Sequence, residues 1–240
     1  MKNIKECIAY AKYDFINLKS TNTLGMVIVF MMFGMMALIS IPEMAFFILI
    51  AAPAVFNALF AMEEESGYCQ LGFFPAKRSN AVYGRFLLTF AATIVLLVIA
   101  FVMTNIARSA NAGMVDLSLE KLPEQAKAVL AQFPKLTDMF IAAAVFLVAN
   151  VLNVTSLTLY YAAGPEKEIA YSFAMLGIVA AVGFAVVKIA DISLMDMLEF
   201  AIDVLENQTL VSVICFAAGV LVNIPYAIIA SRLFIKRIYK

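Results

Sequence analysis

The most informative absence in this chain is histidine, which occurs at none of its 240 positions. Without histidine there can be no Ser–His or Cys–His nucleophile pair and no histidine-bearing zinc site. The cysteines Cys7, Cys69 and Cys215 are odd in number and widely separated, so the sequence predicts neither a disulfide framework nor a thiolate metal site. The chemistry of many hydrolases and metalloenzymes is therefore excluded.

Charged residues are also scarce, and their signs cancel. They make up 14% of the chain, against about 25% in an ordinary soluble domain. Seventeen Lys and Arg balance seventeen Asp and Glu, so no positive excess attracts nucleic acid. A phosphate-binding loop with the pattern Gly-x-x-x-x-Gly-Lys is excluded as well. Gly67 and Gly72 have the spacing of its two glycines, but Phe73 follows where the pattern needs a lysine. We expect no nucleic-acid partner, and no nucleotide or other cofactor bound by this chain itself.

Apolar residues, in contrast, form 64% of the sequence. A soluble domain of this size has too little interior to bury so much apolar surface. A helix that crosses a bilayer needs about 20 apolar residues. Six charge-free runs meet or approach that length: 20–42, 44–62, 86–107, 139–165, 169–187 and 207–231. The sequence therefore predicts an all-α integral membrane protein, with six transmembrane helices in a single transmembrane domain over residues 1–240.

The basic residues predict the orientation of these spans. With the N-terminus in the cytoplasm, twelve of the seventeen Lys and Arg fall in cytoplasmic segments and five in outer ones. Both termini are therefore expected to be cytoplasmic. The extracellular segments 108–137 and 190–206 repeat apolar residues at helical spacing and are expected to form short helices. The acidic side of the second segment is either an exit lip that attracts cations or a solvated face.

Residues 1–19 precede the first span and have an amphipathic pattern. Apolar residues recur at helical spacing from Ile4 to Leu18, while Lys5, Lys12 and Lys19 lie seven positions apart on another face. This pattern is typical of a helix in the membrane interface, with its lysines at anionic headgroups. We expect an interfacial elbow helix here; the alternative is a solvated helix that packs on a loop.

No Asp, Glu, Lys or Arg side chain lies inside the six runs. Ion-driven transporters usually bind the driving ion through such a group, so uphill transport by this chain would need energy from a partner. The polar residues inside the runs include four asparagines: Asn57, Asn150, Asn153 and Asn223. Asparagines in spans commonly join helices by hydrogen bonds, and lining a transport pathway is the alternative.

The cytoplasmic segment 63–80 joins the second and third spans and mixes acidic, aromatic and basic residues. It contains Glu63, Glu64, Glu65, Phe73, Phe74, Pro75, Lys77 and Arg78. The two phenylalanines are too apolar to remain in water, so they must contact lipid or a protein groove. The residues alone leave open whether the segment docks on a partner or is a hairpin whose basic residues reach the headgroups.

This segment resembles the coupling loop of ABC type-2 exporter permeases. The acidic triple is followed by Leu71-x-x-x-Pro75-x-x-Arg78 and by the return into the third span. A second patch is similar to the loop between the fourth and fifth spans in one subgroup, which exports phenol-soluble modulins or confers resistance to peptide antibiotics. It reads Leu159-Tyr160-Tyr161, then Gly164-Pro165-Glu166-Lys167. The Phe73-Phe74 pair differs from the Leu or Thr common in that family.

The resemblance implies half of a transporter in a bacterial cytoplasmic membrane. A second permease chain, identical or different, would complete the pathway, and two copies of a cytosolic ATPase would bind ATP and magnesium. The segment 63–80 would carry the motion of the ATPase into the spans, so this chain would not itself be an enzyme. The implied cargo is an amphipathic or toxin-like peptide. The 20 Phe and 14 Met residues offer the adaptable apolar surface that such cargo needs.

Two other functions are compatible with the sequence. One is a non-transporting sensor or immunity subunit with the same fold, and the other is an ion-driven secondary transporter with an unrecognised ion site. A stable complex with a cytosolic ATPase would separate the exporter from the secondary transporter. An intramembrane enzyme is the poorest alternative, because Glu64 and Glu65 without histidine form no recognisable catalytic set.

Overall fold

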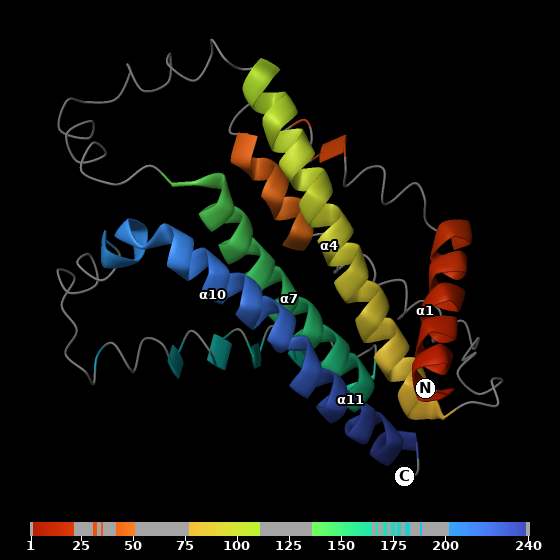
Figure 1. The fold of residues 1–240 in the computed structure, drawn as a ribbon. Coiled ribbons are helices and arrows are strands. Elements are labelled where there is room, and N and C mark those ends of the chain that lie inside the picture. Colours follow the sequence, from red (N-terminus) through yellow and green to blue (C-terminus); the bar gives the residue numbers. More distant parts are fainter. Residues whose placement is uncertain are drawn as a thin grey trace, which may run out of the picture.

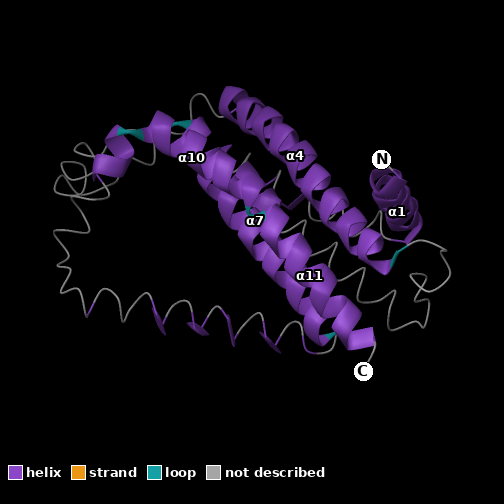
Figure 2. Cartoon of the chain, turned by 60° about the horizontal axis from the view of Figure 1, so that its bottom comes forward, coloured by secondary structure: helices purple, strands orange, loops and turns teal. Residues whose placement is uncertain are grey.

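The fold of this chain is given by a computed structural model. The residues described are 2–21, 31–32, 35, 42–50, 77–110, 136–164, 167, 170–171, 174–175, 177–178, 181–182, 188 and 202–238. Over these residues the chain is helical and contains no strand (Figures 1 and 2). The elements are α1 (Lys2–Thr21), the 3-10 helix η1 (Pro42–Phe47), α4 (Arg78–Ala110), α7 (Asp138–Ala163), α10 (Gln208–Leu221) and α11 (Asn223–Ile238).

Within the described residues, three helical stretches are long and apolar enough to cross a membrane. They are Ser79–Ala110, Asp138–Ala163 and Gln208–Lys236. They coincide with the runs predicted at 86–107, 139–165 and 207–231, which confirms the helical character of these runs and is consistent with an all-α membrane protein. The runs predicted at 20–42, 44–62 and 169–187 lie largely outside the described residues, as does most of the segment 108–137.

The bundle is built around α7. The α10 and α11 helices pack along one side of α7, α4 packs on α7 and α11, and α1 lies beside the first half of α4 (Figure 1). Aromatic rings fill the contacts: Phe146 of α7 lies between Phe90 of α4 and Phe216 of α10, with ring centroids 6.5 and 5.4 Å apart. Gly219 lets α10 approach closely here, because a Cβ at this position would lie 2.9 Å from the Phe146 ring.

Contacts at the two ends of α4 define the directions of the helices. At the end where α4 begins, Tyr83 and Ser231 are hydrogen-bonded at 3.1 Å. At the end where α4 stops, Arg108 contacts Asp138 at the start of α7. The start of α10 is there too, because the Thr137 N–H donates to Gln208 Oε1 at 2.8 Å. Consequently α7 and α10–α11 run parallel to each other and antiparallel to α4; we call the two ends the Arg85 end and the Arg108 end.

Two helix boundaries differ from the predicted ones. The α4 helix begins at Arg78, so the last residues of the predicted loop 63–80 already belong to it. The run 207–231 is interrupted at Val222, between α10 and α11. Pro225 explains the interruption, because it has no N–H to donate to the carbonyl group of Leu221 and so breaks the helical ladder.

Candidate functional site

A buried ion pair connects three helices at the Arg85 end. Arg85 of α4 is 4% exposed, and its Nε donates to Asp14 Oδ2 of α1 at 3.2 Å. Its Nη1 donates to the Tyr160 hydroxyl of α7 at 3.4 Å. We call Asp14, Arg85 and Tyr160 the Arg85 junction. It places α1, the start of α4 and the end of α7 in one hydrogen-bonded unit.

The local sequence allows α1 to approach α4 closely. A Cβ on Gly84 would lie 2.8 Å from the Cys7 carbonyl oxygen and 2.8 Å from the Tyr10 Cβ, so a larger residue would push the two backbones apart. One turn earlier, Asn80 Nδ2 donates to Glu6 Oε2 at 2.6 Å. The first turns of α4 are thus held against α1 by both packing and hydrogen bonds.

Burial dominates the electrostatics of the junction. Desolvation raises the pKa of the Asp14 carboxyl group above its usual range, although the attraction of Arg85 opposes this shift. A buried ion pair therefore adds little net stability, whereas loss of one partner leaves an uncompensated charge in an apolar environment. The pair specifies the position of α1 more than it stabilises the fold.

The opposite side of α1 is exposed. Ile4, Ile8 and Phe15 are exposed there, at 64%, 52% and 58%, and Lys5 and Lys12 are exposed as well. The predicted helix at 1–19 is present as Lys2–Thr21. Its location in the membrane interface stays a prediction, and the exposed apolar and basic side chains are the groups that an interface would contact.

Most residues of the predicted ATPase-coupling loop lie outside the described part of the chain. These are Glu63, Glu64, Glu65, Phe73, Phe74 and Pro75. Lys77 is exposed immediately before α4, and Arg78 is the first residue of that helix. The contact with an ATPase stays a prediction, but the helix that follows the loop is clearly anchored at the Arg85 junction.

The second patch predicted from the sequence is only partly described. Gly164 ends α7 with a φ of 93°, a conformation that glycine adopts without strain. Its N–H donates to the Tyr160 carbonyl at 2.9 Å, Lys167 is exposed, and Glu166 lies outside the described residues. Through the bond from Arg85 to Tyr160, the end of α7 that precedes Gly164 is connected to the start of α4.

Sequence reasoning did not identify Asp14 as part of this site. Asp14 was one of several charged residues in the amphipathic stretch at 1–19. The signal that could have found it is its position: a helical wheel places it beside Cys7 and Tyr10, away from the lysines. Its partner could not have been deduced, because Asp14 and Arg85 are 71 residues apart.

Three of the four predicted pathway asparagines lie together in the middle of the bundle. Asn223 Nδ2 donates to Asn150 Oδ1 at 3.1 Å and to the Gly219 carbonyl at 2.9 Å. Asn150 is fully buried and Asn153 is 2% exposed. We call Asn150, Asn153 and Asn223 the amide cluster. Asn57 lies outside the described residues, and pathway lining stays a prediction.

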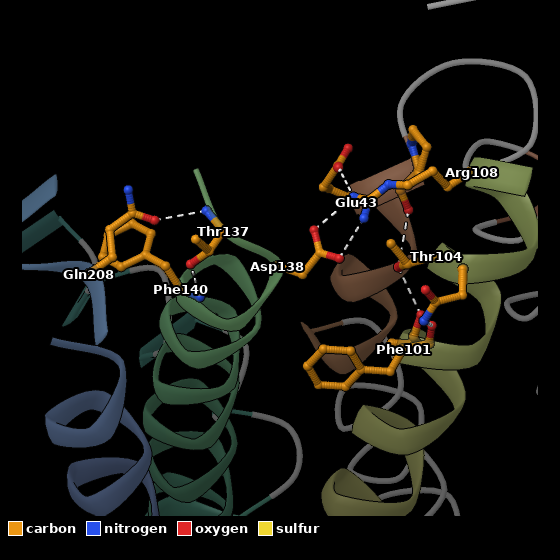
Figure 3. Close-up of polar contacts among 11 residues, drawn as sticks. Glu43, Phe101, Thr104, Arg108, Thr137, Asp138, Phe140 and Gln208 are labelled. Atoms are coloured by element: carbon orange, nitrogen blue, oxygen red, sulfur yellow. Dashed lines mark hydrogen bonds and ion pairs between the residues drawn. The ribbon is translucent and has the colours of Figure 1, made fainter. Parts of the chain in front are cut away.

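A second arginine cluster closes the Arg108 end (Figure 3). Arg108 Nη1 and Nη2 donate to the two carboxylate oxygens of Asp138 at 2.8 and 2.7 Å, and Nη2 also donates to Glu43 Oε1 at 2.7 Å. We call Arg108, Glu43 and Asp138 the Arg108 cluster. Thr104 adds a bond from its hydroxyl to the Pro42 carbonyl at 3.3 Å. Together these bonds hold η1 and the start of α7 to the end of α4.

No family model, no curated protein and no solved structure matches this chain. Among the described residues, no three His, Cys, Asp or Glu side chains are grouped so that they could hold a metal ion. A functional proposal therefore has to start from the residues of the chain itself.

Proposed function

We propose that this chain is the membrane-spanning permease subunit of an ATP-driven ABC exporter. It would work in a bacterial cytoplasmic membrane with two copies of a cytosolic ATPase, which bind ATP and magnesium, and with a second permease chain. The observation that carries the proposal is the Arg85 junction. It binds the helix that follows the predicted coupling loop to both α1 and α7, so a displacement of the loop would reach three helices together.

The contacts at the two ends of the bundle support a six-span topology. The α1 helix meets α4 at the Arg85 end, whereas Glu43 meets Arg108 at the opposite end. Lys77 again precedes α4 at the Arg85 end. The end of α7 lies at the Arg85 end, since Tyr161 packs on Phe234 of α11. The start of α10 lies at the Arg108 end, since the Thr137 N–H donates to Gln208. These contacts support a crossing of the bundle by each predicted run.

The same contacts support two termini on one side of the membrane. The α1 helix and the last turns of α11 both lie at the Arg85 end (Figure 1). The segment 63–80 leads into α4 at this end, and Lys77 and Lys167 are exposed there. Basic residues are enriched in cytoplasmic segments, so the Arg85 end is assigned to the cytoplasm, where a separate ATPase would be found.

The cargo that fits the spans best is an amphipathic or toxin-like peptide. A small ion would need a buried counter-charge, and between Arg85 and Arg108 the α4 helix has only apolar and neutral side chains. Neutral amides and apolar side chains suit a molecule that combines apolar surface with hydrogen-bonding groups.

The decisive experiment is purification of the full chain from native membranes under mild conditions. The proposal expects a cytosolic ATPase in stoichiometric amount, and ATP hydrolysis that an amphipathic helical peptide stimulates. An ATPase complex that exports no peptide would favour the sensor or immunity subunit. A chain that purifies alone and responds to an ion gradient would favour the secondary transporter and overturn the proposal.

A further inference from the structure

The amide cluster lies where α10 gives way to α11, opposite the middle of α7. Asn223 follows the break at Val222, and both hydrogens of its amide are used, towards Gly219 and Asn150. Asn150 Nδ2 donates to the Phe146 carbonyl at 2.9 Å. Since backbone carbonyl groups can only accept hydrogen bonds, these contacts determine which end of each amide carries the nitrogen.

Three polar atoms of this cluster have no hydrogen-bond partner among the described residues. They are Nδ2 and Oδ1 of Asn153 and Oδ1 of Asn223, and all three are buried. Asn150 and Asn153 are three residues apart on one helix, so their Cβ atoms are about 5–6 Å from each other. An unpaired amide inside an apolar bundle loses its bonds to water without replacement. The cluster is therefore a buried polar site whose hydrogen-bonding capacity is only partly used.

The three unpaired amide atoms can form hydrogen bonds with the N–H and carbonyl groups of a peptide backbone. Asn153 offers N–H donors and an acceptor oxygen side by side, and Asn223 adds a second acceptor. A helical peptide has four backbone N–H groups and four carbonyl groups without partners at its ends. In the interior of a membrane these groups need partners, because no water is present to provide them.

We propose that the amide cluster binds the unpaired backbone N–H groups at the N-terminal end of a transported helical peptide, because two of its three unpaired atoms are acceptors. This inference rests on the proposed export function and assigns the polar contact that its cargo would make. The cluster is closed in the packed bundle, so binding requires a neighbouring helix to move away from Asn153. The break at Val222 is the place where the run 208–236 can bend, because the helical ladder is already interrupted there.

The site can be tested with the full chain and its ATPase in lipid nanodiscs. The probes are an acetylated, amidated amphipathic helical peptide and the same peptide with its first three backbone nitrogens methylated. This removes all unpaired N–H donors, because the acetyl carbonyl accepts from the N–H of the fourth residue. The wild-type chain should bind the first peptide about 5–10-fold more tightly, as expected for one or two hydrogen bonds. In N153L, whose side chain has a similar shape but no polar atoms, this preference should disappear.

A matched control is N105L. Asn105 is an exposed residue of α4 whose Nδ2 donates to the Phe101 carbonyl of its own helix at 2.8 Å, so N105L should keep the preference. Thermal unfolding checks the premise separately. N153L should unfold at the same temperature or about 2–4 °C higher, because it removes unmet polar atoms.

Equal binding of the two peptides by the wild-type chain would overturn the site. Retention of the full preference in N153L would overturn the site, and so would a lower unfolding temperature, because it would show that Asn153 is satisfied in the resting protein. A wild-type chain that associates with the ATPase but binds neither peptide would overturn the peptide cargo and this site together, while the permease assignment would stand.

Discussion

The two ends of α4 hold an arginine in opposite ways. Arg85 is buried against Asp14 and Tyr160, with 5% of its side chain exposed, whereas Arg108 reaches Glu43 and Asp138 with 49% of its side chain exposed. The two arginines are 23 positions apart, or about 35 Å along a helix that rises 1.5 Å per residue. This distance is close to the thickness of the hydrocarbon core, about 30 Å.

The difference in exposure should give the two sets of ion pairs different strengths. At the Arg85 end low solvent access makes the ion pair all-or-none: breaking it strands a charge. At the Arg108 end water and salt compete for each bond. The contacts of Arg85 should therefore be costly to break, and those of Arg108 should be weaker and sensitive to salt.

The largest expected loss of stability comes from breaking the buried ion pair between Asp14 and Arg85. D14L leaves Arg85 without its counter-charge and should lower the free energy of unfolding by about 3–5 kcal/mol, measured in detergent or nanodiscs. The double variant D14L/R85L should recover most of that loss, because it removes both charges. A double variant as unstable as D14L would show that the loss does not come from the stranded charge of Arg85.

The second-largest loss of stability is expected at the close approach of α1 to α4. G84A should lower the free energy of unfolding by about 1–3 kcal/mol, because the added Cβ meets the Cys7 carbonyl oxygen and the Tyr10 Cβ of α1 at 2.8 Å. Gly177 is the matched control: a Cβ there meets nothing within 4 Å. G177A should be neutral or slightly stabilising, and equal losses in both variants would contradict the packing seen at Gly84.

At the Arg108 end the effects should be smaller and sensitive to salt. E43Q removes one of the two carboxylates that Arg108 contacts and should cost about 0.2–1 kcal/mol, as is usual for an exposed ion pair. In 1 M NaCl the difference between E43Q and the wild type should vanish, since the Debye length falls to about 3 Å. The loss in D14L should persist in the same salt, and its disappearance would remove the contrast between the two ends.

The smallest effect on stability is expected in the predicted coupling loop. F73A/F74A and K77E/R78E should change the free energy of unfolding by less than about 0.5 kcal/mol, as is usual for substitutions outside a packed core. Both variants should nevertheless lose either the ATPase subunit or peptide-stimulated ATP hydrolysis, measured on the purified complex. Unchanged export by these variants would contradict the assignment of the loop.

The long helices could be predicted from the sequence because a run of apolar residues is a local signal. The apolar runs at 86–107, 139–165 and 207–231 are long enough to predict spans without knowledge of their neighbours, and the helices found there agree. Their boundaries were less accurate: α4 begins eight residues before Phe86. That extension depends on contacts such as the bond from Asn80 to Glu6, which no local pattern reveals.

The polar site residues could be predicted from the sequence only in part. The asparagines stand out in apolar runs, so Asn150, Asn153 and Asn223 could be singled out. Whether such a residue joins helices or stays unsatisfied depends on which side chain lies opposite. Only the bundle shows that Asn150 bonds to Asn223 while Asn153 finds no partner among the described residues.

By itself the sequence determined the class of the protein: helical, membrane-embedded, and without the histidine that much catalytic chemistry requires. Composition and run length suffice for that, because transfer into a bilayer depends on the sum of many similar side chains. The tertiary structure decided which charges are paired and where. The pairing of Asp14 with Arg85, or of Arg108 with Glu43 and Asp138, depends on side chains that lie 30 to 71 positions apart in the chain. Only the packing of the helices brings such groups within hydrogen-bonding distance.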